Sequence, residues 1–210
     1  MMQMGLLAGR KKEGKWQRQK KNEKISHFPH VPDCPITTTR TTTTPATSMS
    51  SITYFHGDLF SAPEGAILAH SCNCIGSWGG GIALQFKKRF PRAHKAYVDH
   101  CKAHAAAPEA LLGTCLLLED TAENSGAVFR IACLFTSVGN SSSLARIKRS
   151  PQDVIIRATQ ESMTDLGRQV DEGVTISMPQ INAGLFCVPW EETEAVLRGF
   201  PGPFHVYVFP

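Results

Sequence analysis

Two glycine-bearing stretches hold most of the residues in this chain that could do chemistry. The first, HSCNCIGSWGGGIA, runs from His70 to Ala83, and the second, PQINAGLFCVPW, runs from Pro179 to Trp190. Successive glycines offer a core no side chains, so a chain keeps them where its backbone must approach another group closely. A glycine-rich turn before a helix presents unpaired N–H groups and the positive end of a helix dipole, which suits an anion or a sugar hydroxyl.

Either stretch alone is explained nearly as well by a tight turn at a close helix contact. Both occur between an apolar run and an amphipathic run, and this repetition favours a two-sided cradle for a phosphate-bearing ligand. Neither fits the GxGxxG or GxxxxGK[ST] pattern, so hydride transfer on a dinucleotide and ATP hydrolysis gain no support.

The cysteines do not indicate a metal centre or a disulfide framework. There are seven, an odd number, scattered through apolar segments, and we interpret them as buried reduced thiols. His70, Cys72 and Cys74 are close in sequence, but no CxxC pair or second cluster completes a tetrahedral set. We therefore expect no metal and no cofactor.

The elements that must position the two stretches alternate between strands and helices. Strands are predicted at 52–56, 66–70, 113–119, 127–137, 174–179 and 204–209, with a turn at 121–126 between the third and fourth. Helices are predicted at 81–104, interrupted at Pro91, and at 150–167 and 189–200. Ser150 is predicted as the cap of the second helical region with Pro151 at its first position, and Pro189 and three carboxylates open the third.

This alternation indicates an α/β layer fold, in which ligands lie at the carboxyl ends of the strands. Both glycine-bearing stretches are expected there.

The charge of the chain divides unevenly along its length. Residues 1–48 hold nine Lys and Arg against three Asp and Glu, whereas the remaining residues hold thirteen against fifteen, within a total of +4. The lysine-rich and threonine-rich composition of 1–48 predicts a disordered tail. A nuclear-localisation or RNA-binding arm, a transit peptide, and a misassigned start before Met49 are the alternatives. A nucleic-acid module is disfavoured, because the rest of the chain carries a net −2 charge.

No segment has the ~18 consecutive apolar residues of a membrane span, and the apolar start is too short for a secretory signal. We expect an intracellular protein of the cytoplasm or nucleus, with one folded domain over 49–210.

Four stretches together resemble a known family. GDLF, AHSCNCIGSWGGGIA, LFTS and PQINAGLFCVPWEETEAVL are similar to the motifs of macrodomains, and most similar to the branch of budding-yeast-type ADP-ribose 1''-phosphate phosphatases. The resemblance covers essentially Met49 to Pro210. It implies a three-layer α/β/α fold with a mixed sheet of about six strands, and ADP-ribose lying across the crest of that sheet.

The resemblance also implies roles for individual residues. Asp58 would accept a hydrogen bond from the adenine amino group, and the Leu59 amide would read a ring nitrogen. Asn73 would hold the distal ribose at the catalytic centre. The implied amide contacts are Gly79, Gly80, Gly81 and Ile82 for the distal ribose and phosphate, and Ala183, Gly184, Leu185 and Phe186 for the diphosphate. The Phe186 ring would also pack on the distal ribose.

Some of these residues have plainer explanations. Asp58 could stabilise a turn, Phe186 could be an ordinary core residue, and a histidine ending an apolar strand is more often structural. His70 stands where the phosphatase branch has a histidine, and it would transfer the proton of water or of the leaving oxygen. Ile75 departs from the branch, where an asparagine would be unsurprising.

The expected activity is therefore that of a hydrolase, a phosphatase that removes the terminal phosphate of ADP-ribose 1''-phosphate, a by-product of tRNA splicing. The expected partners are this small molecule and ADP-ribose, bound by a monomer, with activity retained in EDTA. Two alternatives use the same pocket: hydrolysis of ADP-ribose from modified protein side chains, and noncatalytic ADP-ribose reading.

Overall fold

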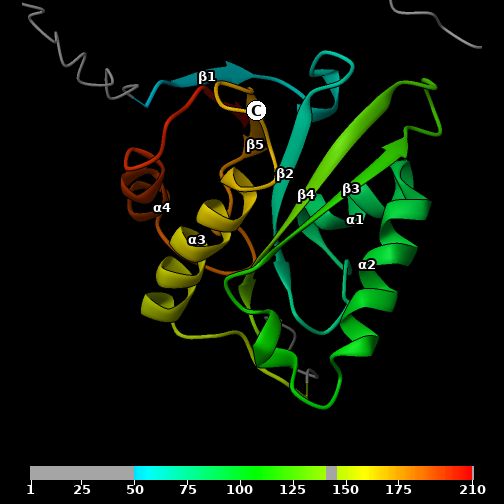
Figure 1. The fold of residues 1–210 in the computed structure, drawn as a ribbon, viewed down its shortest axis with the longest axis vertical. Coiled ribbons are helices and arrows are strands. Elements are labelled where there is room, and N and C mark those ends of the chain that lie inside the picture. The colour runs from blue at the N-terminus through cyan, green and yellow to red at the C-terminus, as the bar shows by residue number, and fades with distance from the viewer. Residues whose placement is uncertain (1–49, 141–145, 210) are drawn as a thin grey trace, which may run out of the picture. The chain divides into compact units, whose positions relative to one another are not determined.

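The described part of the chain is built on one six-stranded sheet (Figure 1). The computed structural model describes residues 50–140 and 146–209, all within the unit Pro45–Pro210. The strands are β1 Ile52–His56, β2 Ile67–Asn73, β3 Cys115–Thr121, β4 Val128–Ser137, β5 Ile176–Pro179 and β6 Phe204–Val208. Their order is β1-β6-β5-β2-β4-β3, and every neighbouring pair is parallel except β3 and β4.

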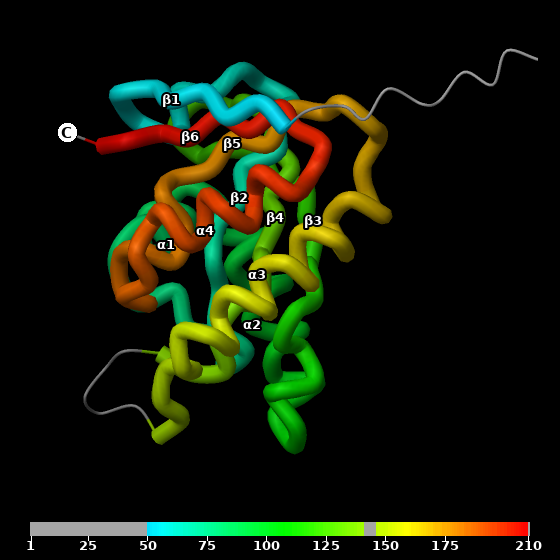
Figure 2. The backbone as a smooth tube through the Cα atoms, turned by 90° about the vertical axis from the view of Figure 1, so that its left-hand side faces the viewer, coloured from blue at the N-terminus to red at the C-terminus, as the bar shows by residue number. Residues whose placement is uncertain are grey.

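Helices cover both faces of this sheet. They are α1 Gly81–Arg89, α2 Pro91–Ala103, α3 Gln152–Gly167 and α4 Trp190–Leu197, with short 3-10 turns η1 Leu59–Ser61 and η2 Pro108–Leu111. Figure 1 shows α1 and α2 on one side of the central strands and α3 and α4 on the other. Figure 2 shows β1, β6 and β5 following one another toward one edge of the sheet. The predicted three-layer α/β/α fold with a mixed sheet is confirmed.

The central strand β2 shows why both faces need a cover. Leu68 and Cys72 belong to the core beneath α1 and α2, whereas Ile67 and Ala69 belong to the core beneath α3 and α4. Side chains of a strand alternate between faces, so the apolar run ILA at 67–69 puts apolar side chains on both faces of the sheet, and both must be covered. The start of β2 therefore has the sequence of a central strand.

The predicted helix break and hairpin are both present. Pro91 begins α2 directly after α1 ends, and Phe90 between them has a non-helical φ of −129°. The turn between β3 and β4 is closed by the Ala122 amide, which donates to the Ala127 carbonyl at 2.8 Å.

Two local predictions are wrong. Ser150 does not cap α3, because its Oγ accepts from the Val138 amide at 3.0 Å and its own amide donates to Ser137 Oγ at 2.9 Å. Pro151 occupies the N-cap position and α3 begins at Gln152. The second strand runs to Asn73 rather than ending at His70.

The predicted tail, residues 1–48, lies outside the described residues. None of the helices in the described part of the chain is long and apolar enough to cross a bilayer.

Candidate functional site

The first glycine stretch is a loop that begins where β2 ends, and Asn73 shapes it. Asn73 Oδ1 accepts from the amides of Ile75 at 3.2 Å and Ser77 at 3.0 Å, and its Nδ2 donates to the Ser77 carbonyl at 2.6 Å. The Tyr97 hydroxyl donates to the Asn73 carbonyl at 2.6 Å. The side-chain amide of Asn73 is therefore engaged within its own loop, and its predicted contact with a distal ribose stays a prediction.

The loop leads into the start of α1. Gly80 is the N-cap residue and offers no side-chain cap, and Gly81 has a φ of +54°, a conformation that favours glycine. The Leu84 amide makes the first helical bond, to the Gly80 carbonyl at 3.3 Å. The amides of the first helical residues have no partner within a helix, so the start of α1 offers donors to an anion.

The second glycine stretch, which we call the β5 loop (Gln180–Pro189), follows β5. Gly184 and Leu185 are exposed, whereas Phe186 is 7% exposed and packs with Ile155 and Val188. The Phe186 side chain is therefore part of a small core beneath the loop, and its predicted packing on a ribose stays a prediction.

The two loops meet. Strands β2 and β5 are neighbouring parallel strands, with Leu68 opposite Ser177, so their carboxyl ends point the same way. A Cβ on Gly80 would lie 3.2 Å from Leu185 Cδ1, which shows how closely the loops approach. The connections leave β2 and β5 toward opposite edges of the sheet, and this is where α/β folds bind their ligands. The two loops therefore adjoin at the carboxyl ends of these strands; we call their junction the crevice, and its predicted role as a phosphate cradle stays a prediction.

A third segment, at and after the end of β4, adjoins both loops; the sequence analysis used LFTS there as a motif but gave Arg149 no role. The Cys74 amide lies 3.0 Å from the Ser137 carbonyl, which joins this segment to the first loop. Arg149 Nη1 donates to the Phe186 carbonyl, which joins it to the β5 loop. The basic run ARIKRS after an apolar strand was the available signal. Arg149 therefore brings a positive charge to the β5 loop.

Asp58 and Leu59 lie apart from the two loops. Asp58 Oδ1 caps η1 by accepting from the Phe60 amide at 3.1 Å, and Oδ2 is 3.2 Å from Arg89 Nη2. Leu59 is buried. Gly81 begins α1 and Arg89 ends it, so Asp58 pairs with the end of α1 that is farther from the first loop. The predicted adenine contacts stay predictions, at the far end of α1.

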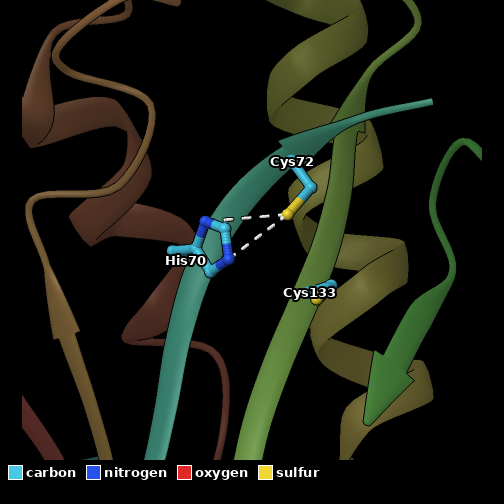
Figure 3. Close-up of side chains that lie close together, drawn as sticks. All are labelled: His70, Cys72 and Cys133. Atoms are coloured by element: carbon cyan, nitrogen blue, oxygen red, sulfur yellow. Dashed lines mark hydrogen bonds between the residues drawn. The ribbon is translucent and has the colours of Figure 1, made fainter. Parts of the chain in front are cut away.

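His70 is enclosed beneath the first loop. Its ring is fully buried, stacks on Phe86 with centroids 4.2 Å apart, and meets Trp78 edge-on at 4.8 Å. Figure 3 shows it on β2 beside Cys72, whose Sγ lies 3.5 Å from Nε2, with Cys133 on the neighbouring β4. Burial lowers the pKa of His70 to about 3. The imidazole is therefore neutral at physiological pH and does not face the crevice.

The same three side chains are the only potential metal cluster among the residues the structure describes. The ligand atoms of His70, Cys72 and Cys133 lie within 4.8 Å of one another, so Cys133 takes the place that sequence proximity suggested for Cys74. All three are buried, and burial raises the pKa of the Cys72 thiol well above its usual range. Three ligand groups are one short of the four of a structural zinc site, so we assign no metal here.

Known proteins similar to this chain in sequence and in fold point to one family. A model of the family described as Macro domain matches residues 69–197. An ADP-ribose 1''-phosphate phosphatase of Meyerozyma guilliermondii is 45% identical over 179 residues, covering 76% of this chain and 99% of that protein. A protein of the same name from Saccharomyces cerevisiae is 40% identical over 182 residues, covering 77% and 99%. The macrodomain of Mycobacterium tuberculosis DarG has a similar fold, with a TM-score of 0.55 and 23% identity, over 77% of this chain and 98% of that one.

Proposed function

Because the chain belongs to the macrodomain family, we propose that it is a phosphatase that removes the terminal phosphate of ADP-ribose 1''-phosphate. The observation that carries this proposal is the crevice in which the first loop and the β5 loop meet, with Leu185 against Gly80. Relatives of 40% to 45% identity that carry this activity in their names support the choice of substrate.

The crevice suits the charge changes of phosphoryl transfer. Water attacks the phosphorus, the bond from phosphorus to the O1'' oxygen breaks, and the products are inorganic phosphate and ADP-ribose. The transferred group carries its charge on the nonbridging oxygens, and catalysis depends on donors fixed around them. The amides that begin α1 would bind these oxygens, the β5 loop would bind the diphosphate, and Arg149 would add positive charge.

The predicted role of His70 in proton transfer depends on access. In the described arrangement the imidazole is fully buried and in contact with Phe86 and Trp78, so contact with the phosphate requires His70 to become accessible. An imidazole that enters the reaction with an ordinary pKa gives an inflection of kcat/KM near pH 6.5. A ring that stays buried gives none between about pH 5 and pH 8, because its pKa is about 3.

The enclosed position of His70 favours one second candidate, noncatalytic ADP-ribose binding. The sequence analysis assigned proton transfer to His70, and His70 is fully buried. The described geometry is therefore also sufficient for a protein that binds ADP-ribose without hydrolysing a phosphate.

The test is phosphate release from ADP-ribose 1''-phosphate by the full chain, with EDTA present and absent, alongside ADP-ribose binding by calorimetry. Turnover that persists in EDTA supports the proposal. Binding without turnover supports the reader, and release of ADP-ribose from a modified protein without phosphate release supports the side-chain hydrolase. Loss of turnover on chelation contradicts the metal-free mechanism.

Two further expectations, on oligomeric state and on location in the cell, belong to this proposal. We expect the protein to act as a monomer, which sedimentation of the full chain measures. We expect it in the cytoplasm or nucleus, which imaging of the tagged chain measures.

A further inference from the structure

We propose that Asn182 is a positioning residue that fixes the β5 loop and thereby sets the affinity of the crevice for phosphate groups. The inference rests on the proposed function, because it assumes that this loop binds the diphosphate. The sequence reasoning gave Asn182 no role, although it directly precedes the predicted amide donors.

Asn182 is a buried hub that ties the loop to both helices of one face and to a strand. It is 2% exposed. Its Oδ1 accepts from Thr136 Oγ1 of β4 at 2.8 Å, and its Nδ2 lies 3.0 Å from Thr159 Oγ1 of α3 and 3.4 Å from Thr193 Oγ1 of α4. All three threonines are fully buried. A buried amide whose donor and acceptor atoms are both used holds one orientation.

The threonine bonds also determine which way the Asn182 amide points. The Thr159 hydroxyl donates its only proton to the Ile155 carbonyl at 2.7 Å, so toward Asn182 it can only accept. The amide nitrogen must therefore face Thr159, and the amide oxygen must face Thr136. A carboxylate at position 182 could accept from Thr136 but could not donate to Thr159.

The backbone of Asn182 defines both ends of the loop. Its φ is +65°, a left-handed conformation that asparagine tolerates better than most residues. Its amide donates to Ser71 Oγ of β2 at 3.3 Å, and its carbonyl accepts from the Val188 amide at 3.1 Å. One residue thus connects the start of the loop to β2, the strand of the first loop, and closes the loop upon itself.

This placement makes Asn182 a determinant of binding as well as of folding. Donors act on a bound anion only when they are held within about 0.5 Å of the required geometry. Gly184 and Leu185 are exposed, and Asn182 is the buried anchor just before them, so it contributes to the direction of their backbone. Loosening that anchor lowers affinity even where the fold persists.

The test compares three variants of the full chain by calorimetry with ADP-ribose and by turnover of ADP-ribose 1''-phosphate. Asn182→Gly keeps the left-handed backbone and removes the side-chain bonds, and Asn182→Asp keeps the shape and removes the donor. Thr164→Ala is the matched control, because its hydroxyl makes only an exposed bond to the Gln160 carbonyl on α3. We expect both Asn182 variants to raise the Kd for ADP-ribose and the KM for ADP-ribose 1''-phosphate about tenfold or more, with a smaller change in kcat. The control should match the wild type in all three constants.

Thr159→Val and Thr159→Ser keep the inference testable if position 182 does not tolerate change. Valine removes the hydroxyl that receives the Asn182 amide, and serine retains it. We expect the valine variant to bind ADP-ribose more weakly and the serine variant to recover the wild-type Kd. Faster hydrogen exchange at 183–187 should accompany the loss.

Two outcomes overturn the inference: Asn182→Gly with a wild-type Kd, or a valine variant that binds as tightly as the serine variant. Failure of the proposed function has a different signature. A wild-type protein that binds ADP-ribose but releases no phosphate removes the phosphatase assignment, while the effect of Asn182 on Kd still supports its positioning role.

Discussion

The burial of His70 predicts a specific dependence of stability on pH. Desolvation by burial lowers the pKa of His70 to about 3 in the folded chain, whereas an unfolded histidine has a pKa of about 6.5. Between these values the unfolded chain binds a proton that the folded chain does not. The stabilisation is therefore complete above about pH 6.5 and is lost progressively as the pH falls toward 3.

The size of the effect follows from linkage. One unit of difference between pH and the unfolded pKa corresponds to about 1.4 kcal/mol. Lowering the pH from about 7 to about 5 should reduce the free energy of unfolding by about 2 kcal/mol through His70 alone. That is a substantial share of the ~5–15 kcal/mol typical of a folded domain.

The assay is urea unfolding of the full chain at the two pH values, followed by tryptophan fluorescence. Wild type is compared with His70→Gln, whose side chain cannot ionise. His94→Gln is the control, because His94 is a histidine that is only partly buried, and burial lowers its pKa too. The free energy of unfolding of the wild type should fall by about 2 kcal/mol more than that of His70→Gln. Equal losses in these two proteins, or a His70 ring that titrates near pH 6.5 by NMR, would refute the reasoning.

Three further predictions concern the crevice and its surroundings. Arg149→Ala should raise KM for ADP-ribose 1''-phosphate about tenfold, as expected for a charge-assisted bond, and Arg149→Lys should recover only part; an unchanged KM across salt concentrations contradicts the role. Gly80→Ala should weaken ADP-ribose binding in calorimetry, because the added methyl group meets Leu185. The free energy of unfolding measured in urea should change by less than about 1 kcal/mol. Asp58→Ala should reduce affinity for ADP-ribose more than for its inosine counterpart, which lacks the amino group; equal losses would instead indicate that Asp58 only pairs with Arg89.

Local signals were sufficient for most of the fold. Alternation of strands and amphipathic runs predicts the layers, Pro91 marks the boundary between α1 and α2, and the polar turn before Ala127 marks the hairpin. These signals depend on residues near one another in the chain, so they can be recognised without knowing how the elements pack. The two glycine stretches could be assigned to strand ends for the same reason.

Where a side chain had a distant competing partner, the local signal failed. Ser150 has the residue type of a helix cap, yet it bonds to Ser137 and Val138 at the end of β4. A cap contributes about 1 kcal/mol, comparable to what a buried polar group gains from a tertiary partner. Tertiary packing therefore decided its role.

The sequence by itself determined that two glycine-bearing loops would each follow a strand and precede a helix, because glycine content and strand periodicity are local properties. Only the tertiary structure decided which side chains lie beside these loops. His70 is buried because α1 covers its face of β2, and Asn182 acts as a hub because four separate elements converge on it. Desolvation and long-range hydrogen bonding depend on neighbours that the chain supplies from distant positions.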